Sequence, residues 1–132
     1  MIVLDTLVLI WLLEGSPKLG RRAAKTASAA LHVDALSVSA TTFWEVAHLV
    51  AKGRIRLEGS PASFRAVVLE LGIREVPVDG DIAIDAASLA AVLADPADCH
   101  IVATARKTGA RLMTADRRIQ DAAVAATIDA SR

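Results

Sequence analysis

The stretch Ile2-Val3-Leu4-Asp5-Thr6 decides the fold, because it joins a short apolar run directly to an acidic residue. The run from Met1 to Leu4 is wholly apolar and contains β-branched side chains, which is typical of a strand that is buried on both faces. Strands of this kind belong to parallel sheets. We therefore expect a central parallel strand that ends at Asp5.

The rest of the chain alternates between strand-like and helix-like patterns. Further strands are expected at 35–39, 73–78, 111–114 and 125–128. Helices are expected at 6–14, 19–31, from Thr41 or Thr42 to the basic turn at 52–54, after Ser60-Pro61 to Gly72, and at 82–93, 97–107 and 117–121. This alternation predicts an α/β protein, a three-layer α/β/α sandwich with a central parallel sheet of about five strands and right-handed crossovers.

Length and charge restrict the possibilities further. A chain of 132 residues is the usual size of one domain, so we expect a single domain over 1–132. Its 15 Lys and Arg residues balance 15 Asp and Glu residues, so the net charge does not attract polyanions. Any nucleic acid must then be bound by local basic patches.

The cysteine content and the hydropathy pattern indicate the cellular compartment. The single Cys99 cannot form an internal disulfide, and His32, His48 and His100 are too scattered for a zinc site. No apolar run approaches the roughly 18 to 20 residues of a membrane span, and 7–13 lacks the flanks of a signal peptide. We expect a reduced, cytoplasmic setting with no membrane partner.

Four acidic residues are expected at one edge of the sheet. In open parallel sheets, ligands bind beyond the carboxyl ends of the strands, where the strand order reverses. Asp5 ends the first expected strand and Asp116 follows the fourth. Glu45 and Asp98 lie in the opening turns of helices that start from the same edge. The four carboxylates are therefore candidates for one site.

Each acid also has a purely structural explanation, which the sequence leaves open. Asp5 and Asp116 fit helix N-caps, worth about 1 kcal/mol each. Asp95 before Pro96 fits a cap as well, and Asp98 suits the positive end of the same helix dipole. Glu45 fits a solvated helix position.

The missing basic partners favour a metal site. No Lys or Arg lies within helical reach of Asp98 or Glu45. Carboxylates that gather in a partly buried place without cations must take up protons or bind a cation. Oxygen-only carboxylate sites suit Mg²⁺ or Mn²⁺.

Four segments together carry a family resemblance. They are Ile2-Val3-Leu4-Asp5-Thr6, Ser39-Ala40-Thr41-Thr42-Phe43-Trp44-Glu45-Val46, Asp95-Pro96-Ala97-Asp98 with Ile101-Val102-Ala103-Thr104-Ala105, and Thr114-Ala115-Asp116-Arg117-Arg118-Ile119. In this order, across nearly the whole chain, they resemble a PIN-domain ribonuclease of the VapC toxin type.

The resemblance implies a site and partners. It places Asp5, Glu45, Asp98 and Asp116 on the four acidic positions of the family, with Asp95 as a further acid. It implies Asp5 and Asp98 as the first candidates for direct Mg²⁺ or Mn²⁺ ligands, then Asp116, with Glu45 as ligand or water-orienting base. It also implies RNA cleavage, with tRNA or rRNA as substrate, a VapB-type antitoxin and a homodimer that forms a heterotetramer or larger assembly with it.

The chain departs from the family pattern near the site. Leu7 stands where many relatives have His, Cys99-His100 where they have Arg-Leu, and Val92-Leu93-Ala94 where they have Leu-His-Gly. None of these changes removes an acid, so they bear on substrate contacts and on the level of activity.

The expected reaction is hydrolysis of an RNA phosphodiester by an activated water, which leaves 5′-phosphate and 3′-hydroxyl ends. Candidates for phosphate contacts are Arg117, Arg118, Lys52, Arg54, Arg21 and Arg22. Antitoxin binding is expected to bury the helices around Trp11 and Trp44. The alternative is a catalytically silent PIN-like protein-binding module in which the acids are only caps. A phosphatase is disfavoured because no Asp follows two residues after Asp5.

Overall fold

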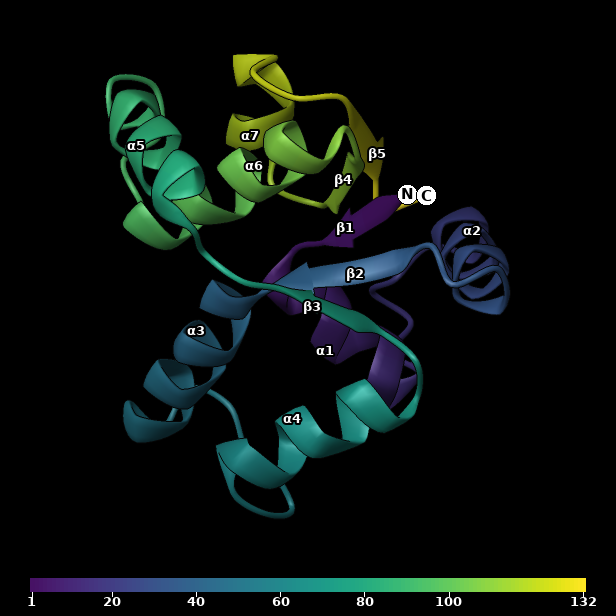
Figure 1. Ribbon diagram of the computed structural model, residues 1–132. Helices are drawn as coiled ribbons and strands as arrows, with labels where there is room; N and C mark the ends of the chain where they lie inside the picture. The colour runs from purple at the N-terminus through teal and green to yellow at the C-terminus, as the bar shows by residue number, and fades with distance from the viewer.

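The computed structural model describes residues 1–132, and its centre is a parallel sheet of five strands (Figure 1). The strands are β1 Ile2–Leu4, β2 Leu36–Ser39, β3 Arg74–Val76, β4 Arg111–Thr114 and β5 Thr127–Asp129. Their order is β3-β2-β1-β4-β5, and every neighbouring pair is parallel. The expected α/β class is therefore confirmed, and β1 is the central strand.

Seven helices surround this sheet. They are α1 Thr6–Glu14, α2 Arg21–His32, α3 Ala40–Ala51, α4 Pro61–Glu70, α5 Gly80–Leu89, α6 Pro96–Thr108 and α7 Arg117–Ala122. Buried residues of α1, α2 and α4 pack on one face of the sheet, and those of α5, α6 and α7 pack on the other (Figure 1). Helix α3 contacts helices from both layers, namely α1, α4 and α6. None of the helices has the length and apolar character that crossing a membrane requires.

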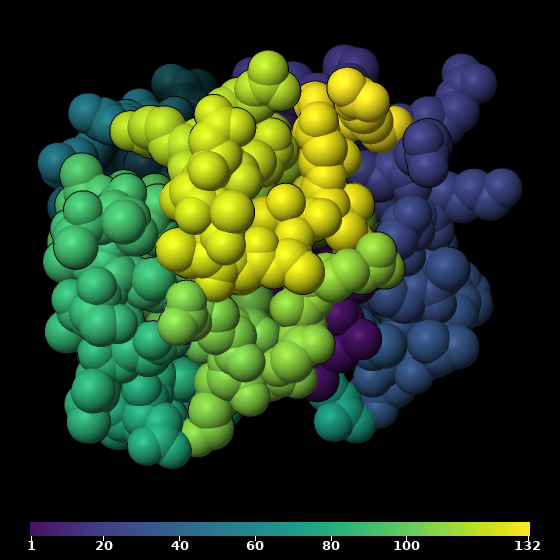
Figure 2. All heavy atoms as spheres, turned by 90° about the horizontal axis from the view of Figure 1, so that it is seen from above, coloured from purple at the N-terminus to yellow at the C-terminus, as the bar shows by residue number.

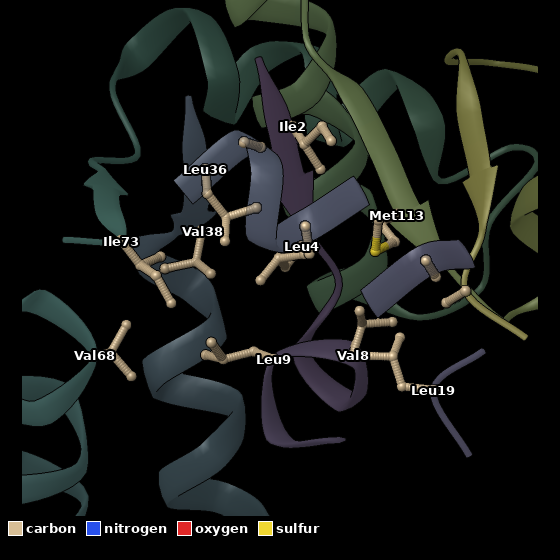
Figure 3. Packing of buried hydrophobic residues seen from close by; sticks show 14 residues of the cluster. Ile2, Leu4, Val8, Leu9, Leu19, Leu36, Val38, Val68, Ile73 and Met113 are labelled. Atoms are coloured by element: carbon tan, nitrogen blue, oxygen red, sulfur yellow. The ribbon is translucent and has the colours of Figure 1, made fainter. Parts of the chain in front are cut away.

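The central strand is buried on both faces, as predicted. Successive side chains of a strand point to opposite sides of a sheet. Leu4 accordingly belongs to the core cluster beneath α1, α2 and α4, while Val3 belongs to the cluster beneath α5, α6 and α7. Figure 3 shows Leu4 among Val38, Leu9 and Met113. The apolar run before Asp5 thus joins the two halves of the core.

Two helix starts differ from the sequence prediction, because residues other than the expected ones cap them. Helix α3 begins at Ala40 rather than after Thr41 or Thr42, since the Ser39 hydroxyl accepts a hydrogen bond from the Thr41 amide at 3.1 Å. Helix α5 begins at Gly80 rather than at residue 82, since the Asp79 carboxylate accepts a hydrogen bond from the Ile82 amide at 2.9 Å.

Other boundaries shift by a few residues. Helix α2 begins at Arg21 rather than residue 19, with Gly20 as its N-cap, and α5 ends at Leu89 rather than at 93. Residues 90–92 form a turn, after which the Leu93 amide donates to the Leu89 carbonyl at 2.9 Å. Strand β5 lies at 127–129 rather than 125–128, because its register pairs Leu112 with Thr127.

Residues 130–132 pack against the start of α2. Figure 2 shows these C-terminal residues, in yellow, on the surface beside the blue segment that contains α2. The Gly20 amide donates to the Ala130 carbonyl at 2.8 Å, and the Arg22 amide donates to the Arg132 carbonyl at 2.9 Å. A Cβ atom on Gly20 would lie 2.1 Å from the Arg132 backbone. Only glycine fits this close approach.

We expect Gly20→Ala to destabilise the protein by about 1 to 3 kcal/mol, because the added methyl group overlaps backbone atoms. The matched control is Gly80→Ala, where a Cβ meets nothing within 4 Å. Urea unfolding measures both changes, and hydrogen exchange at Arg22 shows whether its bond to Arg132 is lost. Equal stability of the two variants would contradict the close packing.

Candidate metal centre

The candidate site lies at the carboxyl ends of β1 and β4, the neighbouring strands at which the strand order reverses. A cleft of about 390 Å³ opens there. Its lining includes all five acids predicted from the sequence: Asp5, Glu45, Asp95, Asp98 and Asp116. Asp5 follows β1, Asp116 follows β4, Glu45 lies on α3, and the other two begin α6. The structure therefore brings the five carboxylates to one place.

Thr114 links the two strand-end acids. Its hydroxyl donates to Asp5 Oδ2 at 2.7 Å and accepts from the Asp116 amide at 3.0 Å. The other oxygen, Asp5 Oδ1, accepts from the Thr6 amide at 2.8 Å. This buried hydroxyl therefore orients Asp5 and fixes the start of the Asp116 turn. The sequence interpretation assigned Thr114 no role, although a polar residue that ends an apolar strand is a usable signal.

Asp116 is the one acid of the cleft with a basic partner. It caps α7 by accepting from the Arg118 amide at 2.9 Å, and the Arg118 guanidinium contacts its other oxygen at 3.1 Å. These contacts lower the pKa of Asp116 below its usual value. Arg118, predicted as a phosphate contact, lines the same cleft and is the only cation among its lining residues.

Three other acids form the tightest group. Carboxylate oxygens of Glu45, Asp95 and Asp98 all lie within 4.8 Å of one another. Asp95 caps α6 by accepting from the Ala97 amide at 2.9 Å, and Asp98 is the third residue of that helix. Glu45 Oε1 is buried and has no hydrogen-bond partner. A buried acceptor without a donor is costly, which indicates that a cation or a water belongs there.

Burial and mutual repulsion raise the pKa values of Asp98, Glu45 and Asp5. Burial, followed by the negative charges of Asp5, Asp95, Glu45 and Asp116, raises the pKa of Asp98 to about 7. Burial is also the largest cause of the raised pKa values of Glu45 and Asp5. The cleft thus concentrates more negative charge than its single arginine neutralises.

The donor set fits a divalent cation. Mg²⁺ and Mn²⁺ prefer carboxylate oxygens and retain positions for water and phosphate. Glu45, Asp95 and Asp98 supply oxygens at close spacing, and Asp5 and Asp116 line the same cleft. Capping does not prevent binding by Asp95, because its cap bond uses Oδ1 and a carboxylate offers about four lone-pair positions.

The metal-free protein is expected to lose stability as pH rises from about 4 to about 7. The folded-state pKa of Asp98, about 7, exceeds the unfolded value of about 3.9, so the folded state binds the extra proton in this window. The raised pKa values of Asp5 and Glu45 also lower stability as pH rises. The lowered pKa of Asp116 changes stability only below this pH window. Melting curves in EDTA should give a lower Tm at pH 8 than at pH 5, with a smaller difference in Asp98→Asn. A Tm that rises across this window in both proteins would contradict the charge assignment.

The protein is an α/β protein with a parallel sheet, and its acidic cleft lies where the strand order of that sheet reverses. The PIN domain family model matches residues 2–125. Over 120 residues the chain is 33% identical to Ribonuclease VapC22 of Mycobacterium tuberculosis (strain ATCC 25618 / H37Rv), covering 90% of this chain and 89% of that protein. The chain therefore belongs to the PIN domain family, and the resemblance to VapC-type members is confirmed.

Solved structures agree with this assignment. A chain of FitAcB from Neisseria gonorrhoeae is similar with a TM-score of 0.69 and 26% identity, over 98% of this chain and 97% of that one. A chain of VapBC2 from Rickettsia felis, bound to a DNA fragment from its promoter, gives a TM-score of 0.74 at 13% identity, over 98% of both chains. The second likeness shows the fold alone.

Proposed function

We propose that this protein is the toxin of a type II toxin–antitoxin system and acts as a Mg²⁺- or Mn²⁺-dependent endoribonuclease. The observation that carries the proposal is the convergence of five carboxylates in one cleft, with Glu45 Oε1 buried and without a partner. The name of the relative Ribonuclease VapC22 supports the activity.

In this proposal Asp95 and Asp98 hold the cation, Glu45 is a further ligand or the proton acceptor, and Asp5 and Asp116 are further candidates from the same cleft. The cation would polarise the scissile phosphate and stabilise the leaving oxygen. Binding of the cation requires Asp98 to lose the proton that it holds near neutral pH because its pKa is raised. Arg118, exposed at the cleft, is placed to contact a phosphate oxygen.

Glu45 is the candidate for the proton acceptor. A water oxygen attacks phosphorus, its proton passes to a carboxylate such as Glu45, the bond from phosphorus to the 3′ oxygen breaks, and that oxygen takes up a proton from solvent. The products carry 5′-phosphate and 3′-hydroxyl ends. Since the nucleophile comes from water, the ribose 2′-hydroxyl is not needed, and a 2′-deoxy nucleotide at the cut site should still be cleaved.

The proposal also includes a protein partner. One structural neighbour is a toxin-antitoxin complex from Klebsiella pneumoniae, and another is VapBC2 bound to a DNA fragment. We propose a VapB-type antitoxin as the partner of this chain and a homodimer that assembles with it into a heterotetramer or larger complex. Exposed Leu7, beside the acids in the cleft, gives such a partner an apolar contact next to the site.

A catalytically silent binding module explains the structure less well. Helix capping accounts for Asp5, Asp95 and Asp116, each of which accepts a bond from a helix amide. It does not account for Glu45, whose buried oxygen has no partner, or for Asp98, which caps no helix. A cation site explains both of these residues.

Incubation of the purified, partner-free protein with tRNA and ribosomal RNA tests the proposal. Cleavage is expected with Mg²⁺ or Mn²⁺ and not in EDTA, and ligation that requires a 5′-phosphate should capture the products. Absence of metal-dependent cleavage with both RNAs would favour the silent module.

A further inference from the structure

A second, smaller hollow lies between α3 and α6, outside the acidic cleft. Its volume is about 270 Å³, and it is lined by Thr41, Trp44, Pro96, Ala97 and His100. No acidic or lysine or arginine side chain is among these residues. The hollow is therefore suited to a flat, uncharged group that carries hydrogen-bonding atoms at its edge.

Trp44 gives the hollow an aromatic wall that is held in place. The indole is 59% exposed, which is unusual for the largest apolar side chain. It stacks on the His48 ring with centroids 4.9 Å apart and planes 10° apart. Trp44 lines the hollow and His48 does not. An ordered, exposed aromatic ring of this kind is a platform for stacking a base.

The hollow adjoins the acids along both of its walls. Trp44 directly precedes Glu45 on α3, and Pro96 and Ala97 separate Asp95 from Asp98 on α6. The hollow and the cluster of Glu45, Asp95 and Asp98 therefore both lie between α3 and the start of α6. In a single-stranded RNA whose phosphate occupies the cleft, the base of that nucleotide or of a neighbour reaches the hollow.

We propose that the hollow of Trp44 is a nucleobase subsite for single-stranded RNA, in which the base stacks on the indole. The inference rests on the proposed function in taking RNA as the substrate, and it adds a base-binding side chain, Trp44, outside the acidic cleft. Base pairing would prevent a base from entering the hollow, so loops and single strands are bound in preference to duplex.

A second copy of the chain fits the hollow less well. Stable protein interfaces bury about 800 Å² and roughly 20 to 30 residues on each side. The hollow is formed by five side chains and is concave. Its size lies below the usual range of about 300 to 1,000 Å³ for pockets of drug-sized ligands, as expected for a single ring system.

Fluorescence tests the stack without any cleavage. Trp11 and Trp44 are the only tryptophans, so Trp44 is the sole indole in Trp11→Phe. In EDTA, a short single-stranded oligoribonucleotide should quench this emission in a saturable way, whereas an abasic oligomer of the same length should not. Equal quenching by both oligomers, or none by either, would overturn the subsite.

Kinetics give the second test. Trp44→Leu keeps an apolar side chain but removes the ring, and it should raise KM for single-stranded RNA about tenfold with little change in kcat. Trp44→Phe should restore most of the loss. The control Ile84→Ala removes an exposed apolar side chain on α5 and should leave KM unchanged.

The outcomes separate the two proposals. Cleavage with an unchanged KM in Trp44→Leu overturns the subsite and leaves the ribonuclease standing. Quenching by the oligoribonucleotide without cleavage of any RNA supports the subsite and contradicts the enzyme. A change of oligomeric state in Trp44→Leu on a sizing column, with KM unchanged, assigns the hollow to a contact between copies and overturns the subsite.

Discussion

Replacing Asp98 with Asn is expected to reduce metal-dependent RNA cleavage by at least about 100-fold while the protein stays folded. Asn keeps the shape of the side chain but removes the charge that would bind the cation. Mutation of groups that merely support metal ligands costs about 10- to 100-fold, so loss of a ligand should cost more. Single-turnover cleavage at saturating Mn²⁺ measures the effect.

Asp121→Asn is the matched control for this change. Asp121 is exposed on α7 and does not line the cleft, so its variant should cleave RNA at the rate of the unchanged protein. In EDTA at pH 8, Asp98→Asn should also melt at a higher temperature than the unchanged protein, because the variant lacks the negative charge that the neighbouring acids repel. Equal cleavage by Asp98→Asn and Asp121→Asn would remove Asp98 from the site.

Leu4→Ala is expected to cause the largest loss of stability among the changes considered, about 2 to 5 kcal/mol. Leu4 is fully buried in the central strand and belongs to the cluster shown in Figure 3. Truncation leaves a cavity beneath β1 that neighbouring helices cannot fill without moving. Urea unfolding measures the change, and for a chain of this size each kcal/mol lowers Tm by roughly 3 to 6 °C.

Leu71→Ala provides the comparison for Leu4→Ala. Leu71 is 49% exposed at the end of α4, so the same chemical change should alter stability by less than about 0.5 kcal/mol. A loss below about 1 kcal/mol for Leu4→Ala would mean that β1 does not join the two halves of the core.

The strongest local patterns predicted the fold. The apolar run before Asp5 gave the central strand, and Gly109 after a basic last turn gave the end of α6 within a residue. Such signals lie within a few residues of the feature they determine. Ser39 was not recognised as the cap of α3, because Thr41 and Thr42 nearby are also capping residue types.

The convergence of the acids was predicted, and their internal arrangement was not. Because parallel strands end at one edge of a sheet, the pattern alone placed Asp5 and Asp116 at the same edge, whereas the pairing of β1 with β4 comes from the structure. The bond from Thr114 to Asp5 spans 109 positions of sequence and depends on the register of β1 and β4. The closeness of Asp95 to Glu45 depends likewise on how α3 packs against α6.

The capping bonds of Asp5, Asp95 and Asp116 determine how well the fold tolerates point mutations at these positions. Asn caps helices as well as Asp does, and one guanine-to-adenine transition converts an Asp codon to an Asn codon. In the function proposed above, a single point mutation at one of these positions would therefore remove a candidate metal ligand and keep the capping bond, so the inactive protein would stay folded.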